Sequence, residues 1–193
     1  MGVLSDFDLR HLITDFGCRV LVETGSGGGQ GVDAAAPLDF QQIFAIEPQH
    51  KLALAVALRH AANHKVTVIH AKIAAGLKEA LAEIDPTAAA IFWMDAHQPG
   101  ADGRPQLEAQ LRLIAAHRDI SHDVILIDDL RLYEDAAYDE GPCPEGQKPS
   151  DEYRHLHFLA PLLQDTHDIE RSRRRTGYLC AYPRTAAPGP GAC

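Results

Sequence analysis

The chain has 193 residues, 46% of them apolar, and its 27 acidic side chains exceed its 18 lysines and arginines to give a formal net charge of −9. This length suits one domain with a sizeable core, and the acidic balance argues against a nucleic-acid-binding surface, which needs a basic face. No apolar run approaches the roughly 20 residues that span a bilayer, and the first residues lack the basic and apolar regions of a signal peptide.

Alternating strands and helices are predicted along the whole chain. Apolar runs bounded by turn residues predict strands at 18–23, 42–47, 65–70, 89–95, 123–128, 167–174 and 177–182. Helical spacing and Ala/Leu-rich composition predict helices at 3–16, 30–36, 49–62, 74–84, 105–117 and 151–164. The strand cores are continuously apolar, which is typical of a parallel sheet buried on both faces. The fold class is therefore α/β, with one domain over residues 1–183 and a flexible Pro/Gly-rich tail at 184–193.

A glycine-rich turn between the first strand and the next helix is the most informative stretch. Val20–Glu23 is followed by glycines at 25, 27, 28, 29 and 31, and a helix is expected from about Val32. Such a turn brings backbone N–H groups close to a ligand, because glycine tolerates positive φ and leaves room where a Cβ would stand. The alternative is a flexible loop without a ligand.

Glu47 ends the next strand. A carboxylate at this position can accept hydrogen bonds from both ribose hydroxyls of an adenosine ligand. The alternative is that Glu47 is an exposed acid at the end of a strand.

These motifs resemble those of the class I S-adenosylmethionine-dependent methyltransferases, over about residues 18–182. The family's first motif is an acid followed by Gly-x-Gly-x-Gly, which stands here as Glu23, Gly25, Gly27 and Gly29, with Ser26 between them. The second motif is the acid that ends the next strand, here Glu47. The resemblance implies a Rossmann-like, seven-stranded, mostly parallel sheet, with S-adenosylmethionine bound by these residues and by Asp95. The family's adenine-contacting position falls at His70–Lys72, which departs from the usual acidic or small polar residue.

Three aspartates at neighbouring strand ends are similar to those of metal-dependent O-methyltransferases of the macrocin type. In the methyltransferase strand order Asp95, Asp128 and Asp129 converge beside the glycine turn, and clustered carboxylates repel one another unless a proton or cation bridges them. Mg²⁺ or another divalent cation would then hold the acceptor oxygens and lower the pKa of the hydroxyl. The alternative is that the aspartates only cap loops. Arg131 can orient an anionic acceptor or pair with these aspartates.

Catalytic roles are expected for Asp95 and His97. His97 can take the acceptor proton or bind the metal, because imidazole titrates near neutrality; the alternative is an exposed loop histidine. Residues 133–150 form a long connection, in which Tyr133, Tyr138 and Cys143 can line an acceptor pocket or belong to a mobile loop. The run Arg171–Arg175 is expected to be a solvated strand and turn.

The predicted function is S-adenosylmethionine-dependent O-methylation of a small-molecule hydroxyl, such as that of a sugar or natural product. A non-catalytic S-adenosylmethionine-binding partner is the alternative. An NAD-dependent oxidoreductase ranks lower. The dinucleotide-binding fingerprint G-x-G-x-x-G/A fits Gly29–Ala34, but its first glycine should directly follow the strand, and when the count starts at Gly25 the third glycine position is occupied by Gln30.

The four cysteines form no CxxC pair, as expected for reduced thiols in a cytoplasmic protein. We expect no nucleic-acid or membrane partner. Formation of a homodimer is possible from the sequence and is not decided by it.

Overall fold

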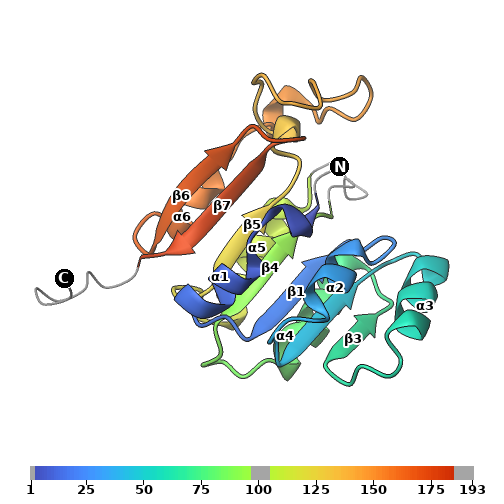
Figure 1. Cartoon of the computed structure of the whole chain (residues 1–193). Coiled ribbons are helices and arrows are strands. Elements are labelled where there is room, and N and C mark those ends of the chain that lie inside the picture. Colours follow the sequence, from blue (N-terminus) through green and yellow to red (C-terminus); the bar gives the residue numbers. More distant parts are fainter. Residues whose placement is uncertain (1–2, 97–104, 185–193) are drawn as a thin grey trace, which may run out of the picture.

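The computed structural model describes residues 3–96 and 105–184, in which seven strands form one sheet (Figure 1). The strands are β1 (Val20–Thr24), β2 (Gln42–Ile46), β3 (Val66–Ile69), β4 (Ala90–Met94), β5 (Val124–Ile127), β6 (His167–Ser172) and β7 (Tyr178–Pro183). Their spatial order is β3-β2-β1-β4-β5-β7-β6. The first five run parallel to one another, and β7 is antiparallel to both β5 and β6. The expected seven-stranded, mostly parallel sheet is confirmed.

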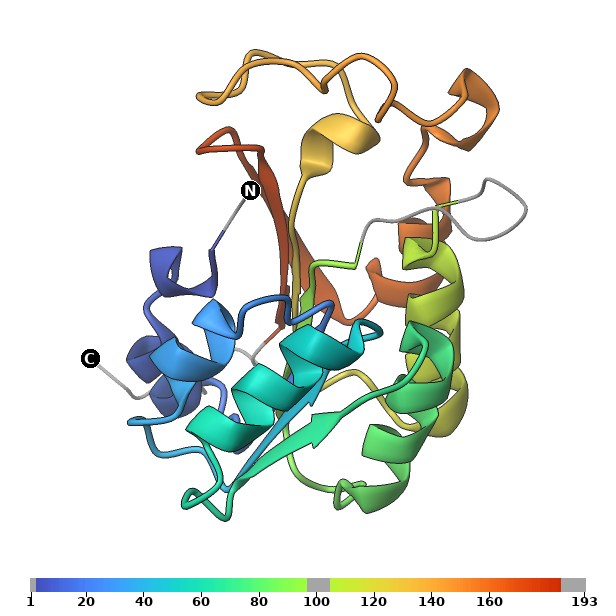
Figure 2. The same ribbon diagram turned by 90° about the vertical axis from the view of Figure 1, so that its right-hand side faces the viewer.

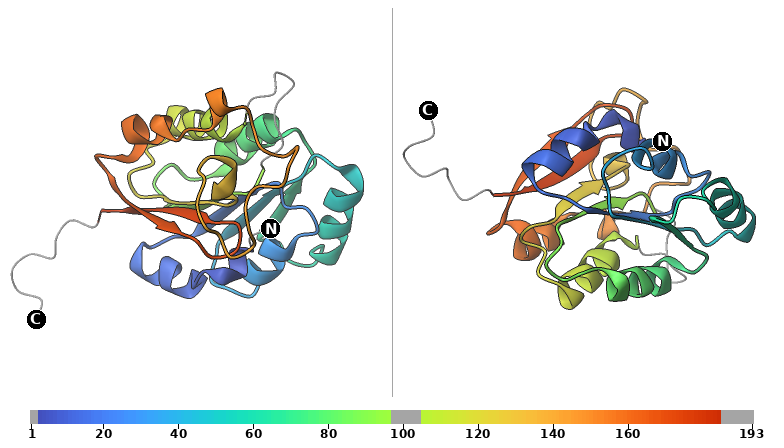
Figure 3. Two further views of the ribbon diagram at one scale, coloured as in Figure 1. Left: turned by 90° about the horizontal axis from the view of Figure 1, so that it is seen from above. Right: turned by 60° about the horizontal axis from the view of Figure 1, so that its bottom comes forward.

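Helices cover both faces of this sheet. They are α1 (Leu9–Asp15), α2 (Gln30–Ala35), α3 (His50–Arg59), α4 (Ile73–Glu83), α5 (Leu107–His117) and α6 (Ala160–Leu163). Successive side chains of a strand point to opposite faces. Leu21 of β1 accordingly packs with Val32 of α2 in one cluster, whereas its neighbour Val22 packs with Leu77 of α4 in the other. Figure 3 shows α1, α2 and α3 on one side of the sheet and α4, α5 and α6 on the other.

The predicted N-terminal helix at 3–16 is broken into two pieces. A 3-10 turn, η1 (Leu4–Asp6), precedes α1, and Phe7 between them is extended, with φ −100° and ψ 144°. Asp8 caps α1 by accepting a hydrogen bond from the His11 N–H at 3.1 Å. The cap therefore lies two to three residues beyond the predicted Ser5 or Asp6, because an N-cap needs non-helical backbone followed by a free N–H.

The prediction of a single helix at 151–164 is wrong. The segment contains two 3-10 turns, η3 (Asp151–Tyr153) and η4 (His157–Leu159), before the four residues of α6. Pro161 lies in the first turn of α6. Proline has no N–H to donate and its ring clashes with the carbonyl one turn earlier, so a helix can begin beside it but cannot continue through it.

The carboxyl ends of the parallel strands share one edge, where ligands bind in open α/β sheets. A further 3-10 turn, η2 (Leu130–Leu132), follows β5 at this edge, and the chain from η2 to η3 lies beyond the end of β5 (Figures 1 and 2). Within residues 3–96 and 105–184, no helix is long and apolar enough to cross a membrane.

A buried ion pair joins several elements at the opposite edge. Arg118, which ends α5, donates to both carboxylate oxygens of Asp123, from Nε at 2.8 Å and from a terminal nitrogen at 2.9 Å. Arg118 is 5% exposed at its side chain and Asp123 0%. Asp123 also accepts from the Ala90 N–H at 2.9 Å, and its carbonyl oxygen lies 2.9 Å from Nε2 of His167. This cluster therefore connects α5, β4, β5 and β6.

Candidate active site

The predicted glycine turn connects β1 to α2 at the carboxyl edge of the sheet. Gly25, Gly27 and Gly29 have φ values of 79°, 52° and 81°, a region that side chains with a Cβ rarely adopt. The two ends of the turn are closely packed, because a Cβ on Gly25 would lie 3.1 Å from Ala96 and one on Gly29 would lie 2.7 Å from Val56. Its middle is open, since a Cβ on Gly28 would meet no atom within 4 Å. The turn thus presents exposed backbone between two fixed ends.

Glu47 holds this turn directly. Its Oε2 accepts the Gly27 N–H at 2.8 Å, and its Oε1 accepts the Gln49 N–H at 2.7 Å. The Ile46 carbonyl accepts the N–H groups of Gly25 and Ser26 at 2.9 and 3.1 Å. A carboxylate offers about four lone-pair sites, so Glu47 keeps acceptor capacity after these two bonds. The end of β2 and the glycine turn therefore form one rigid unit.

Glu23 lies beneath the turn and is only 3% exposed. It is packed so tightly against Gly31 of α2 that a Cβ there would collide with its carboxylate. Burial, followed by the nearby charge of Asp95, raises the pKa of Glu23 to about 8, although a hydrogen bond from the Val32 N–H opposes the shift. Its Oε2 has no hydrogen-bond partner among the described residues. Glu23 thus supports the turn from inside and does not line an open surface.

Two more buried oxygens beside the turn have no hydrogen-bond partner in the described part of the chain. They are the Thr24 and Ser26 hydroxyls. Both residues are buried, with exposed fractions of 0% and 6%. Native structures rarely leave buried polar atoms unpaired. Both residues flank Gly25 at the start of the turn, where a bound polar ligand would pair their hydroxyls.

The three aspartates lie at adjacent strand ends, as predicted, but each is engaged differently. The Asp95 N–H donates to the Thr24 carbonyl at 3.2 Å, next to the glycine turn. Asp128 is fully buried and accepts the Thr176 hydroxyl at 2.9 Å. Asp129, at φ 48°, accepts Nε of Arg131 at 2.7 Å. Arg131, expected either to orient an anionic acceptor or to pair with the aspartates, pairs with Asp129 in the structure.

No group of three or more His, Cys, Asp or Glu side chains is placed to hold a metal ion among residues 3–96 and 105–184. Asp128 accepts a hydroxyl and Asp129 is paired with a guanidinium, and the three aspartates do not form a metal-binding group within the described ranges, so the metal site stays a prediction. His97, the predicted base, lies outside the described residues.

The predicted adenine-contacting position includes His70, which is exposed. Its Nε2 lies 3.2 Å from the Pro48 carbonyl oxygen, and the centre of its ring lies 5.1 Å from that of His50.

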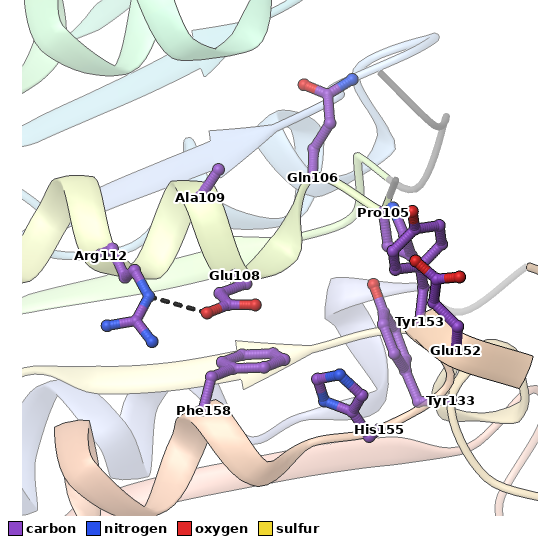
Figure 4. Close-up of a pocket in the computed structure, with 10 residues that line it drawn as sticks. All are labelled: Pro105, Gln106, Glu108, Ala109, Arg112, Tyr133, Glu152, Tyr153, His155 and Phe158. Atoms are coloured by element: carbon purple, nitrogen blue, oxygen red, sulfur yellow. Dashed lines mark hydrogen bonds and ion pairs between the residues drawn. The ribbon is translucent and has the colours of Figure 1, made fainter. Parts of the chain in front are cut away.

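A cavity of about 540 Å³ lies between the first half of α5 and residues 152–158 (Figure 4). Tyr133, predicted to line an acceptor pocket, is one of its walls, whereas Tyr138 and Cys143 are not. Tyr138 instead packs against Gly177. Sequence reasoning missed His155 and Phe158, which also line the cavity, because their segment was predicted to be one continuous helix.

Comparison with known proteins finds similarity only at the level of structure. No protein-family model and no curated protein sequence matches this chain. An O-methyltransferase from Bacillus cereus, solved with S-adenosylhomocysteine, has a TM-score of 0.63 and 14% identity over 91% of this chain and 79% of its own. The O-methyltransferase TomG from Streptomyces achromogenes, solved with S-adenosylmethionine, has a TM-score of 0.62 and 18% identity over 92% and 78%.

The chain has the class I methyltransferase fold. Its strand order and its antiparallel β7 agree with the fold that the resemblance implied. The methyltransferase fold also serves larger acceptors. An rRNA methylase from Streptococcus thermophilus has a TM-score of 0.54 and 13% identity, over 91% of this chain and 96% of its own. The fold therefore does not support the expected exclusion of nucleic acid, which stays a prediction from charge.

Proposed function

We propose that this protein binds S-adenosylmethionine and transfers its methyl group to the hydroxyl oxygen of a small molecule. One observation carries the proposal: the glycine turn after β1 is bonded through Gly27 to Glu47 at the end of β2, at 2.8 Å, within a methyltransferase fold. Two solved proteins of this fold hold S-adenosylmethionine or S-adenosylhomocysteine. Open sheets bind ligands at this edge.

The residues at the turn fit this cofactor. The open backbone at Gly27 and Gly28 leaves room for its amino-acid portion, where any side chain would intrude. The remaining lone pairs of Glu47 suit the two ribose hydroxyls. The Ser26 hydroxyl, buried and unpaired among the described residues, is a further polar contact. Asp95, beside the turn, would place negative charge near the cofactor's ammonium and sulfonium groups. Glu23, whose pKa is raised to about 8 by burial and which is therefore largely protonated at neutral pH, would support the turn from beneath.

The bound cofactor supplies an electrophilic methyl group whose leaving group is a neutral thioether. In the proposed transfer, the acceptor oxygen would form a bond to the methyl carbon while the carbon–sulfur bond broke, and the electron pair would stay on sulfur. The chain's main contribution is to hold the two reactants in line, since proximity and orientation supply much of the rate. The hydroxyl proton must go to a base, and we propose His97, assisted by Asp95, from its place after β4. No step is assigned to a divalent cation, because residues 3–96 and 105–184 contain no group of three or more side chains that could hold one.

The net charge of the chain favours a small-molecule acceptor over a nucleic acid. A net charge of −9 disfavours an RNA acceptor, because binding to nucleic acid depends on neutralising phosphates with Lys and Arg. A small molecule is therefore preferred over the RNA substrates of some proteins with this fold. A non-catalytic cofactor-binding protein is the second candidate. Location in the cytoplasm and a homodimer stay predictions.

Calorimetric titration with S-adenosylhomocysteine tests the proposal, with and without Mg²⁺ and with NAD⁺ as the competing ligand. We expect micromolar binding of S-adenosylhomocysteine alone. Glu47→Gln should weaken it about tenfold or more, because hydrogen bonds to charged groups contribute about 1.5–3 kcal/mol. Glu79→Gln, an exposed change on α4, is the matched control and should leave the affinity unchanged.

Binding of NAD⁺ in place of S-adenosylhomocysteine would overturn the proposal and favour the Gly29–Ala34 fingerprint. If S-adenosylhomocysteine binds, incubation with S-adenosylmethionine and hydroxyl acceptors separates enzyme from binding protein. Consumption of the cofactor that depends on the acceptor supports the enzyme. Binding without consumption across the acceptors tested favours the non-catalytic alternative.

A further inference from the structure

The cavity beside α5, called here the α5 cavity, has aromatic side chains on part of its wall. Four rings face it, from Tyr133, Tyr153, His155 and Phe158 (Figure 4). The His155 ring is stacked on His157 at 5.1 Å and lies edge-on to Phe158 at 6.5 Å. Phe158 is 6% exposed. A rigid wall of rings of this kind suits a flat aromatic ligand, because aromatic groups gain from offset stacking and edge-to-face contact.

Two buried polar atoms line the α5 cavity without a hydrogen-bond partner among the described residues. They are the Tyr133 hydroxyl and Nδ1 of His155. Tyr133 is only 4% exposed. Burial, with a smaller contribution from Asp129, raises the pKa of Tyr133, so its hydroxyl keeps its proton and can donate. Leaving such a group unpaired is unfavourable, and a ligand in the cavity would pair it.

The permanent charges around the α5 cavity disfavour an anion. Arg112 pairs with Glu108 at 2.8 Å, and the two offset each other, as Figure 4 shows. Glu152 also lines the cavity. Among the described lining residues, two carboxylates against one guanidinium leave an excess negative charge. An anionic ligand would meet like charge here, whereas an uncharged or cationic one would not.

The α5 cavity adjoins the edge that carries the glycine turn. Gln110 of α5 donates to the Ala96 carbonyl at 3.4 Å, and Ala96 is the residue against which Gly25 is packed. Tyr133 directly follows η2, which follows β5. The helix that forms one wall of the cavity is thus bonded next to the end of β4, and the wall residue Tyr133 lies shortly after β5.

We propose that the α5 cavity holds the methyl acceptor and that this acceptor is an uncharged or cationic aromatic hydroxyl compound, with an oxygen or nitrogen that accepts a hydrogen bond from Tyr133. This inference rests on the proposed methyl transfer. It narrows the acceptor from any small hydroxyl compound to an aromatic one, and it disfavours acceptors that carry carboxylate or phosphate groups.

Binding of three probes to the S-adenosylhomocysteine-loaded protein tests the chemistry of the cavity. The probes are 2-naphthol (neutral), tyramine (cationic) and 4-hydroxybenzoate (anionic), measured by calorimetry. We expect the first two to bind, and 4-hydroxybenzoate to bind at least tenfold more weakly. Equal or tighter binding of 4-hydroxybenzoate would overturn the charge argument.

Two variants and one control tie the binding to the cavity. Tyr133→Phe removes the unpaired hydroxyl and should weaken 2-naphthol several-fold. Tyr138→Phe is the matched control, since Tyr138 is also buried but donates to the Glu134 carbonyl at 3.4 Å and does not line the cavity. Ala109→Trp fills the cavity from an exposed position on α5, so it should abolish probe binding without disturbing the core. Undiminished binding to Ala109→Trp would overturn the assignment.

The result for the cofactor separates this inference from the proposed function. If S-adenosylhomocysteine binds and none of the probes does, the inference is wrong and the proposed function stands. If the probes bind but S-adenosylhomocysteine does not, the cavity does not hold a methyl acceptor. Transfer of a radiolabelled methyl group from S-adenosylmethionine to 2-naphthol or tyramine, lost in Ala109→Trp while cofactor affinity is unchanged, is the result we expect.

Discussion

Removing Arg118 is expected to destabilise the fold strongly, because its partner Asp123 would be left charged and unpaired in the interior. Asp123 is 0% exposed, and the guanidinium of Arg118 also donates to the Ala88 carbonyl at 2.6 Å. Breaking a buried pair by deleting one partner costs about 3–5 kcal/mol. We therefore expect Arg118→Leu to lose about that much of the free energy of unfolding at pH 8, a large part of a typical domain's roughly 5–15 kcal/mol.

The loss should depend on pH in a defined direction. Burial, opposed by Arg118, already raises the pKa of Asp123 in the folded chain from 3.8 to about 6, and without Arg118 it should rise further. Between the unfolded and folded pKa values the folded chain holds a proton that the unfolded chain has released, so stability falls as pH rises. At pH 5 the Asp123 carboxyl of the variant is largely neutral, and the loss should be clearly smaller than at pH 8.

Urea unfolding followed by the fluorescence of Trp93, the single tryptophan and 1% exposed, measures both effects. Arg19→Leu breaks the exposed pair with Asp39, whose side chains are 42% and 92% exposed, and should cost less than about 1 kcal/mol. Arg118→Leu combined with Asp123→Asn should recover part of the stability at pH 8, because no charge remains buried. A loss below about 1 kcal/mol in Arg118→Leu, or an equal loss at both pH values, would refute the reasoning.

Two further predictions concern the glycine turn. Gly29→Ala should lower the free energy of unfolding by about 1–3 kcal/mol, because its Cβ would lie 2.7 Å from the buried Val56 at a φ of 81°. Gly28→Ala, with open space around it, should stay within about 0.5 kcal/mol of wild type in the same urea titration, and equal losses would contradict the packing argument. Because the pKa of Glu23 is raised to about 8, wild type loses stability as pH rises from about 4.5 to 8, so Glu23→Gln should raise the melting temperature more at pH 9 than at pH 6. A difference in melting temperature that does not change between these pH values would show that Glu23 titrates normally.

The sheet could be predicted from the sequence because each strand is a short apolar run that carries its own signal. Runs such as Val20–Val22 are buried on both faces, and the turn after β1 needs glycines whatever packs around it. The predicted strand bounds are accordingly within two residues of those observed. Glu47 was singled out from its place at a strand end, and its bond to Gly27 connects two motifs that are 20 residues apart in the chain.

The segment around Arg154 could not be predicted, because its conformation depends on distant partners. The side chain of Arg154 is 8% exposed, and it donates to Asp135 at 2.7 and 3.0 Å and to the Leu132 carbonyl at 3.1 Å. These bonds hold Arg154 at φ −86° and ψ 65°, outside the helical region. Composition alone favours a helix there, and only the tertiary contacts reveal the rings that face the α5 cavity.

The aspartates show a similar limit. Strand-end positions correctly predicted that Asp95, Asp128 and Asp129 lie on neighbouring elements. Thr176, the partner of Asp128, comes from the turn between β6 and β7, which is 48 residues away in the chain. A carboxylate's position can be read from a strand pattern, whereas its hydrogen-bond partner depends on which loop folds back over it.

The place of β7 in the sheet has a consequence for the order of assembly during synthesis. β7 is the last strand of the described residues, yet it lies between β5 and β6. Until residues 178–183 have left the ribosome, β5 has an open hydrogen-bonding edge and β6 has no strand to pair with. Unpaired edges of apolar strands are templates for association with other chains. A nascent chain that stalls after β6 would therefore be prone to aggregate, and the arrival of β7 would pair β5 and β6 in one step.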